Sequence, residues 1–468
     1  MNFNNDPLNM PARGSLLRFI AKAMLLVGLM AAFVACQPAK SPGPVRSPRA
    51  QKWFDRARAS YNQMDVEDAQ DAINEALRHA PQDPDIRLLA TNLALAKLDY
   101  QEAIRLTEGT SDSKSLALRG RAQWYSGAVQ KAGDTLELLL RDPDVHDPWA
   151  KAISKLANQG AGRKPYTSEG DIVAAVEMPR VRGTALIVPV EIDGEQGLAL
   201  ISTGTAEVVL DKAQRREPSW VSLRFDGRVE FQDVPAVTQD LSGISRQLGA
   251  PIKAMLGVNF LRNANVTFDF QGRQFVVRQF VPPRPPRATD VPLYYVRGGG
   301  MMIRSALSAE SSPTPASLLI DSSQMFPLAL DADGWGKAGV DIKELTPLEG
   351  EPNIKHGIVP MIRLGAFDVP QVAGVLGAEI ETLESVLGLN IDGVVGSGLL
   401  GGFRITFGDS GKMLWMEEDF MPAPSERPEA PAPAEGGDPA VGDPSLQLPG
   451  SVGEPQPTST PGANQPGK

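Results

Sequence analysis

The stretch GLALISTGTAEVVLD, residues 197–211, places a short polar turn between two apolar runs. Apolar and β-branched residues lead into Ser202, Thr203 and Gly204, and a second apolar run follows them. This pattern predicts a strand, a tight turn and a second strand. Just upstream, the dipeptide Asp193–Gly194 suits a two-residue hairpin turn, so this part of the chain is predicted to consist of short β-strands.

The same pattern occurs again further along the chain. The segment PASLLIDSSQMFPLAL, residues 315–330, runs an apolar strand into Asp321, Ser322 and Ser323 and leaves through apolar residues. Three pairs of residues after the two turns share one separation, 139 residues: Gly257 and Gly396, Thr267 and Thr406, and Gly272 and Gly411. A common offset over three positions indicates two related lobes in one chain.

Each lobe resembles the lobe of retropepsin-like aspartic proteases. That family has a D-[ST]-G turn, a later apolar-apolar-Gly segment and a closing strand hairpin. Two such lobes in one chain resemble the bilobal, pepsin-like arrangement, with a mainly β fold. The resemblance implies that the two turns face each other and that each supplies one carboxylate of a proton-sharing pair. One carboxylate then takes a proton from water while the other polarises the scissile carbonyl.

Both turns depart from the family pattern. Ser202 stands where the first lobe of the family has aspartate, and Ser323 stands where the second has glycine. A serine hydroxyl holds its proton at pH 7 and cannot replace a carboxylate as a base. Loss of a general acid–base group costs on the order of 10² to 10⁴ in rate. Asp321 is therefore the one candidate catalytic residue of the two motifs.

The other candidate site residues follow from the same motif. The cleft-equivalent positions are Ser202, Thr203, Gly204, Ser322 and Ser323, and the lobe-motif glycines are Gly257 and Gly396. Two alternatives stay open for Asp321. It is a turn aspartate that bonds its own backbone, or it forms a dyad when two copies bring their second lobes together, as symmetric retroviral enzymes do.

The N-terminus has the shape of a secretory signal. Basic residues precede the apolar run 23–36, which is too short to span a bilayer stably. The ending FVAC resembles a bacterial lipobox, although Phe33 departs from the usual leucine. The resemblance implies a signal peptide over residues 1–36 with a lipidated Cys36, and a lipid-anchored protein of the bacterial cell envelope, at the outer membrane. The alternative is an ordinary buried cysteine in an uncleaved signal anchor.

A Pro-rich spacer over 37–49 leads to a helical segment over 50–157. Its pattern repeats every 34 residues: Ala69 matches Ala103, and Tyr61 matches Leu95. This period resembles tetratricopeptide repeats, which implies a protein-contact surface. A generic helical bundle is the alternative.

The remaining divisions follow from composition. The first lobe is predicted over 172–280, after a linker at 158–171, and the second over 293–420, after a Pro-rich connector at 281–292. The tail over 421–468 is rich in Pro and Gly and is predicted to be disordered. A net charge of −10 argues against a nucleic-acid partner. The three histidines lie far apart in the sequence, so neither a metal site nor a cofactor is predicted.

Three functions remain open from the sequence. The first is a membrane-anchored protein whose protease-like lobes bind a peptide or protein in the interlobe cleft without cutting it, with the helical repeats as a second contact surface. The second is an active aspartic peptidase that uses Asp321 with an unconventional partner. The third is an envelope scaffold that uses the helical repeats alone.

Overall fold

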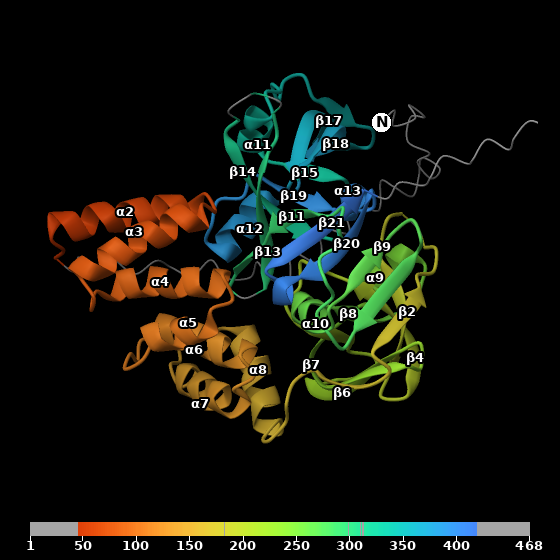
Figure 1. The fold of residues 1–468 in the computed structure, drawn as a ribbon, viewed down its shortest axis with the longest axis horizontal. Helices are drawn as coiled ribbons and strands as arrows, with labels where there is room; N and C mark the ends of the chain where they lie inside the picture. The colour runs from red at the N-terminus through yellow and green to blue at the C-terminus, as the bar shows by residue number, and fades with distance from the viewer. Residues whose placement is uncertain (1–44, 182, 298, 309, 311–312, 419–468) are drawn as a thin grey trace, which may run out of the picture. The chain divides into compact units, whose positions relative to one another are not determined.

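The computed structural model describes residues 45–181, 183–297, 299–308, 310 and 313–418. The predicted signal peptide with Cys36, most of the spacer, and the predicted tail lie outside these residues. Among the described residues, no helix is both long enough and apolar enough to cross a membrane. Figure 1 labels many of the helices and strands named below.

The first part of the described chain is helical. Its helices are α2 (Pro48–Asn62), α3 (Val66–His79), α4 (Pro84–Ala96), α5 (Tyr100–Leu106), α6 (Ser113–Tyr125), α7 (Val129–Leu140) and α8 (Pro148–Gln159). Each helix packs against the next one along the chain. Ala69 and Ala103, the pair found 34 residues apart, are both fully buried.

Capping residues explain where three of these helices begin. The side chains of Ser47, Asp83 and Asp147 each accept a hydrogen bond from a backbone N–H in the first turn of α2, α4 and α8. Proline follows each of them at the first helical position, where its fixed φ fits and its missing N–H costs nothing. The short dipeptides Ser-Pro and Asp-Pro therefore set these helix starts.

The first lobe is built on a seven-stranded sheet in the order β1-β7-β5-β8-β4-β3-β6, with an added pairing of β6 to β7. Its strands are β1 (Thr167–Gly170), β3 (Ile187–Ile192), β4 (Glu195–Ile201), β5 (Val208–Asp211), β6 (Ser219–Phe225), β7 (Val229–Gln239) and β8 (Ile252–Leu256). Two short helices, α9 (Ser242–Leu248) and α10 (Val258–Asn263), flank β8. Strand β1 lies inside the segment predicted as a linker and pairs with β7.

The second lobe is built on an eight-stranded sheet in the order β12-β13-β14-β19-β15-β18-β17-β16. Its strands are β12 (Tyr294–Val296), β13 (Gly300–Ala306), β14 (Pro315–Asp321), β15 (Leu328–Leu330), β16 (Thr346–Leu348), β17 (Glu351–Leu364), β18 (Phe367–Leu376) and β19 (Gly393–Gly396). Its helices are α11 (Ala332–Lys337), α12 (Ile380–Leu387) and α13 (Ser397–Leu400).

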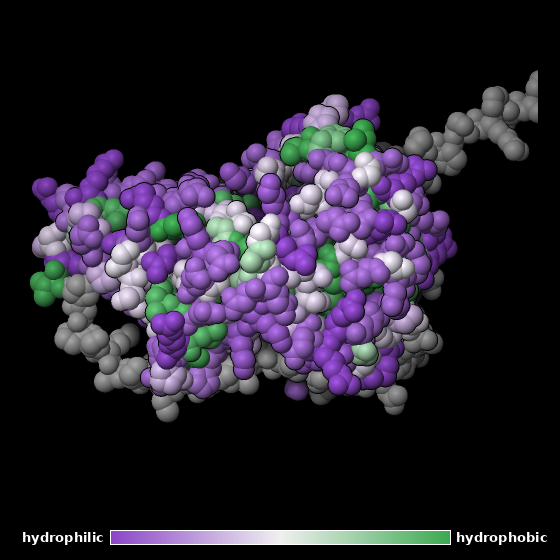
Figure 2. Space-filling view, turned by 90° about the horizontal axis from the view of Figure 1, so that it is seen from below, coloured by the Kyte–Doolittle hydropathy of each residue, from purple (hydrophilic) through white to green (hydrophobic). Residues whose placement is uncertain are grey.

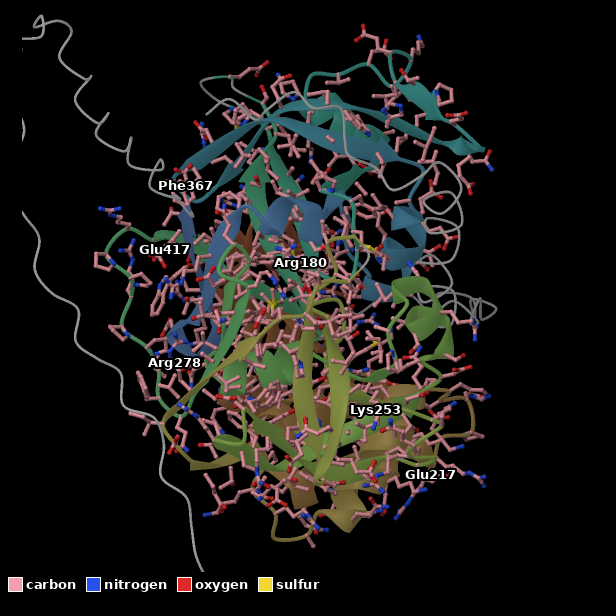
Figure 3. The ribbon with its side chains drawn as sticks, turned by 90° about the vertical axis from the view of Figure 1, so that its right-hand side faces the viewer. Arg180, Glu217, Lys253, Arg278, Phe367 and Glu417 are labelled. Carbon is pink, nitrogen blue, oxygen red and sulfur yellow. The ribbon has the colours of Figure 1, made fainter. Side chains whose placement is uncertain are left out.

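A third, six-stranded sheet joins the two lobes in the order β11-β21-β20-β9-β10-β2. Its strands are β2 (Val173–Glu177), β9 (Thr267–Asp269), β10 (Gln274–Arg278), β11 (Thr289–Pro292), β20 (Phe403–Gly408) and β21 (Met413–Glu418), with a 3₁₀ turn at Asp409–Gly411 before β21. Figure 3 labels Arg278 on β10 and Glu417 on β21. The connector predicted over 281–292 therefore ends in a strand of this sheet.

The joining sheet is centred on the repeat itself. Thr267 on β9 lies opposite Thr406 on β20, and their hydroxyl oxygens are 2.8 Å apart. These two residues are one of the pairs with the offset of 139. Equivalent residues that face each other mark the local two-fold relation between the lobes. A helical region followed by a mainly β region of two lobes confirms the architecture predicted from the sequence.

The helices pack on both lobes. Strand β12 contacts α4, and Met302 and Leu319 belong to the same buried cluster as Leu93 of α4. Helix α8 packs on β6 and β7 of the first lobe, where the Trp220 indole donates to the Leu156 carbonyl at 2.8 Å. One helical region therefore holds both lobes of the β region.

Large apolar side chains are mostly buried by this packing. Figure 2 shows a face that is mainly hydrophilic, with separate hydrophobic patches. Exposed large apolar residues include Ile172, Phe280 and Val281, which lie next to the ends of β2 and β10.

Candidate functional site

Each of the two motif turns leaves the end of a central strand. Ile201, at the end of β4, lies opposite Leu256 in a parallel pair, so Ser202 follows beside Gly257. In the second lobe, Asp321 at the end of β14 lies opposite Gly396 in the corresponding parallel pair. The structure thus brings each predicted turn next to its predicted glycine.

The two turns are joined by four hydrogen bonds. The Thr203 N–H donates to the Ser322 Oγ at 3.1 Å, and the Ser322 N–H donates to the Thr203 Oγ1 at 2.8 Å. The Thr203 hydroxyl donates to the Ile320 carbonyl, and the Ser322 hydroxyl donates to the Ile201 carbonyl, both at 3.0 Å. The hydroxyls of Thr203 and Ser322 therefore each accept a hydrogen bond from a backbone N–H of the other turn. Each also donates a hydrogen bond to a backbone carbonyl in a strand of the other lobe.

The two side chains that form these four hydrogen bonds are buried. Thr203 and Ser322 are 3% and 1% exposed, respectively. A typical hydrogen bond adds about 0.5–1.5 kcal/mol net, and a buried partner left unpaired costs about 1–3 kcal/mol. The four bonds thus fix the turns of the two lobes against each other, and they explain why threonine and serine occupy the middle motif positions.

The Asp321 carboxylate is held by donors from its own turn. Its Oδ1 accepts from the Ser323 N–H at 3.0 Å and from the Ser323 hydroxyl at 2.6 Å. Its Oδ2 accepts from the Gln324 side-chain amide at 3.3 Å. Asp321 thus bonds its own backbone, as the turn-aspartate alternative predicts. The same side chain also faces the first lobe.

Gly204 shows how closely the carboxylate approaches the first lobe. A Cβ added at Gly204 would lie 2.6 Å from the Asp321 Cγ and 2.6 Å from its Oδ2. Any side chain at the third motif position of the first lobe would have to displace the Asp321 carboxylate that lies against it. The two-fold relation predicts that Ser323 lies opposite Ser202, as Gly204 lies opposite Asp321. The Ser202 side chain is shorter than aspartate, so this position is expected to tolerate the Cβ of Ser323.

Ser202 occupies the position across from Asp321 without a charge. It is 1% exposed, and its N–H donates to the Leu256 carbonyl at 3.1 Å. Its Oγ lies 3.1 Å from the Thr205 Oγ1, so its hydroxyl is satisfied within its own turn. The paired turns therefore contribute one carboxylate, from Asp321.

The two lobe-motif glycines have equivalent surroundings. A Cβ at Gly257 would lie 2.2 Å from the Glu207 carbonyl oxygen, and a Cβ at Gly396 would lie 2.1 Å from the Phe326 carbonyl oxygen. Glu207 and Phe326 each follow the first residue of their turn by five positions. Both glycines are thus required by a close backbone approach.

A small pocket adjoins Asp321 on the side of the second lobe. Its volume is about 40 Å³, far below the roughly 300–1,000 Å³ of ordinary small-molecule sites. It is lined by Asp321, Gln324, Phe326, Ala378, Glu379, Ile380, Leu383 and Val394. Among the residues that the structure describes, no group of His, Cys, Asp and Glu side chains is placed to hold a metal ion.

Several of these residues were not predicted from the sequence. Gln324 follows the motif directly, and an amide beside a candidate aspartate was the only available signal. Glu379 and the apolar residues of α12 come from a segment more than fifty positions away. Nothing in their local pattern indicates that they meet Asp321.

No family model and no curated protein matches this chain. An aspartic proteinase from Irpex lacteus is similar in structure, with a TM-score of 0.35 and 9% identity, over 53% of this chain and 97% of that chain. A retropepsin-like aspartic protease from Rickettsia conorii has a TM-score of 0.21 and 16% identity, over 28% of this chain and 91% of that chain. The arrangement of the two turns is established by this chain's own strand pairings and by the four hydrogen bonds between the turns.

Proposed function

We propose that this protein binds an extended peptide or protein segment in the cleft between its lobes and does not hydrolyse it. The observation that carries the proposal is the single carboxylate at the paired turns. Asp321 has both oxygens bonded by Ser323 and Gln324, and its counterpart is the uncharged Ser202. A proton-sharing pair needs two carboxylates, and the paired turns supply one.

The pocket beside Asp321 supports a peptide as the ligand. Its apolar side chains include Phe326, Ile380 and Leu383, and its polar groups include the Gln324 amide. A pocket of this size accommodates a short apolar side chain rather than a separate small molecule. An extended peptide offers side chains at alternate positions and backbone groups between them.

The test uses the full-length protein in detergent and a pool of randomised peptides, from about pH 3 to about pH 7, across the range where carboxyl groups titrate. Peptides retained by the immobilised protein are identified by mass spectrometry, and new peptide termini report cleavage. We expect retention without cleavage. Cleavage by the wild-type protein that Asp321→Asn removes would contradict the proposal.

A variant of the pocket distinguishes selective peptide binding from nonspecific adsorption. Leu383→Glu places a charge among the apolar lining residues and is expected to abolish selective retention. Glu381→Gln, on the same helix but not among the lining residues, is the matched control and should retain the same peptides. Equal retention by the wild-type protein and Leu383→Glu would place binding outside this pocket.

A second candidate is an active peptidase with an unconventional pair of carboxylates. The observation that favours it is Glu379, which lines the same pocket as Asp321. This candidate predicts cleavage by the wild-type protein that both Asp321→Asn and Glu379→Gln remove. If Glu379→Gln binds peptides as the wild type does and neither protein cleaves them, this candidate fails.

We also propose that the protein is anchored to the bacterial cell envelope through a lipid on Cys36. The lipobox-like ending of the apolar run at 23–36 supports this proposal. We expect Cys36→Ser to move the protein from the membrane fraction to the soluble fraction. A wild-type protein that carries no lipid by mass spectrometry would contradict the anchor.

A further inference from the structure

A cluster of buried polar side chains lies where the helices contact the first lobe. Glu207, which follows the first-lobe turn and precedes β5, is 4% exposed. The Trp149 indole of α8 donates to its Oε1 at 3.1 Å. Its Oε2 has no hydrogen-bond partner among the described residues. One oxygen of this carboxyl thus holds the helical region, and the other is buried without a partner.

Helix α10 of the first lobe supplies the rest of the cluster. Asn259 is 1% exposed, and neither polar atom of its side-chain amide has a partner among the described residues. Arg262 is 8% exposed and donates to the Tyr100 hydroxyl of α5, while its Nε is unpartnered in the described part of the chain. Buried polar groups are normally satisfied, so such a cluster at one contact is unusual.

Aromatic rings from the helices enclose the guanidinium of Arg262. Its Cζ lies 5.4 Å from the ring centroid of Tyr100 and 5.9 Å from that of Tyr125 on α6. Cation–π contacts of this kind favour a charged arginine in an enclosed site. The cluster therefore holds a positive charge at the contact between the helices and the first lobe.

Glu207 is the carboxyl group of this cluster, and its pKa lies above its ordinary value. Burial raises the pKa of Glu207, and the neighbouring Trp149, Tyr125 and Trp124 side chains and the charge of Arg262 offset this only in part. Burial also raises the pKa of the three facing tyrosines, which stay neutral: Tyr100, Tyr125 and Tyr166. Burial lowers the pKa of Arg262, but the hydrogen bond that it donates to the Tyr100 hydroxyl helps to leave the pKa raised, so Arg262 stays charged.

We propose that Glu207 makes the docking of α5, α6 and α8 on the first lobe pH-dependent, with firm docking when its carboxyl is neutral and weaker docking when it is ionised. The geometry supports this because the ionised form would leave a charged oxygen, Oε2, buried without a hydrogen-bond donor. The proposal concerns the contact of the helices and is independent of whether the cleft binds a peptide.

The direction of the pH effect follows from the pKa shift. A carboxyl whose pKa is raised in the folded state contributes stability that is fully present below its ordinary value of 4.5. That contribution is lost as the pH rises through the raised pKa. Docking is therefore expected to weaken from acid toward neutral pH.

The cluster is also joined to the candidate site. The Asn259 N–H donates to the Ala206 carbonyl at 3.0 Å, and the Val258 N–H donates to the Thr205 carbonyl at 2.8 Å. The chain from Ser202 to Glu207 thus connects the first-lobe turn with the helices. The corresponding residue of the second lobe is Phe326, which has no ionisable side chain. The proposed pH-dependent contact is therefore specific to the first lobe.

The test is hydrogen exchange of the backbone amides of α8 in the full-length protein, from about pH 5 to about pH 8. The wild type is compared with Glu207→Gln at each pH, which cancels the intrinsic pH dependence of exchange. The expected ratio of exchange in the wild type to exchange in the variant rises with pH, by up to about tenfold for each unit by which the pKa is raised. A ratio that is constant over this range would overturn the proposal.

Glu217→Gln is the matched control. Glu217 is exposed, pairs with Lys155 of α8, and stands at the periphery of the view in Figure 3. The corresponding exchange ratio for Glu217→Gln should stay flat over the same range. A rise as large as that for Glu207→Gln would show a general charge effect and would also overturn the proposal.

A second measurement does not depend on the stability of Glu207→Gln. The fluorescence of Trp149 should change as its carboxyl partner ionises, so the wild-type protein should show a titration with a midpoint above pH 4.5. Trp149→Phe should show a smaller transition, because the Trp124 side chain also lies beside Glu207. A wild-type signal without a transition would contradict the role of Glu207.

Discussion

The two lobes use the same turn geometry for different tasks. In the second lobe, the turn presents Asp321, and the residue five positions later, Phe326, lines the pocket beside it. In the first lobe, the turn begins with Ser202, and the residue five positions later, Glu207, binds the Trp149 indole of the helical region. The carboxyl group of Glu207 thus contacts the helices, whereas that of Asp321 lines the pocket of the second lobe.

The two lobes share their backbone framework. Both lobes keep the hydroxyl exchange of Thr203 and Ser322 and the close approach at Gly257 and Gly396. They differ in the side chains that the framework presents. Equivalent substitutions in the backbone framework of the two lobes should therefore change the unfolding free energy by similar amounts. Substitutions of the differing side chains should not.

The largest expected effect is on the two glycines of the framework. Gly257→Ala and Gly396→Ala each place a Cβ about 2 Å from a backbone carbonyl oxygen, which cannot move without its strand. We expect each to lose more than about 4 kcal/mol of unfolding free energy, or to prevent folding. Urea unfolding followed by circular dichroism measures this.

The control for the glycines is Gly243→Ala. A Cβ there meets no atom within 4 Å, and the residue lies in α9. Alanine should be neutral or stabilise by up to about 1 kcal/mol. A loss at Gly396 with none at Gly257 would break the equivalence of the lobes.

The hydroxyl exchange should have a smaller effect, again symmetric. Thr203→Val and Ser322→Ala each remove one acceptor and one donor and leave a buried N–H and a buried carbonyl of the opposite lobe unpaired. We expect each to cost about 2–4 kcal/mol of unfolding free energy. The double variant should cost less than the sum, because the two side chains act on one interface.

Strict additivity would contradict the shared interface. Ser308→Ala gives a control on an exposed hydroxyl whose hydrogen bond with the Glu310 N–H lies outside the interface. Its unfolding free energy should stay within about 0.5 kcal/mol of the wild type.

The smallest expected effect is the pH dependence of the stability that Asp331 contributes to the second lobe. Burial raises the pKa of Asp331, which caps α11, to about 6, with smaller contributions from Asp392 and Asp333. Its stabilising contribution is therefore present below its ordinary value of 3.8 and is lost as the pH rises through about 6.

Asp331→Asn keeps the cap and removes the titration. We expect the melting temperature of the wild type to fall between about pH 4 and about pH 7 relative to this variant. Asp333→Asn, on the same helix, should follow the wild type. A parallel course for the wild type and Asp331→Asn would show that Asp331 does not titrate in this range.

Much of the framework could be predicted from the sequence because its signals are local. The apolar strand that leads into Ser202–Thr203–Gly204, and the offset of 139 shared by Thr267 and Thr406, give the lobes and their relation. The starts of α2, α4 and α8 follow from single capping residues. These features depend on spacing and backbone preference, which a sequence displays directly.

The side-chain environment could not be predicted in the same way. Glu207 is an ordinary acidic residue in the sequence, and only the fold places it against Trp149, 58 positions away. Glu379 reaches the pocket of Asp321 because α12 packs there, and the predicted connector ends in β11 because the joining sheet offers it a partner in β21. Long-range contacts of this kind carry no local pattern.

The most direct test of the central claim is to restore the first-lobe carboxylate. Ser202→Asp alone should meet the Cβ of Ser323, so the decisive protein is the double variant Ser202→Asp/Ser323→Gly, with Ser202→Asn/Ser323→Gly as its uncharged control. Cleavage of the peptide pool at about pH 4, near the pKa of carboxyl pairs, is measured for both variants and the wild type. Cleavage is expected from the aspartate variant only. Cleavage by the wild type that Asp321→Asn abolishes would contradict the central claim.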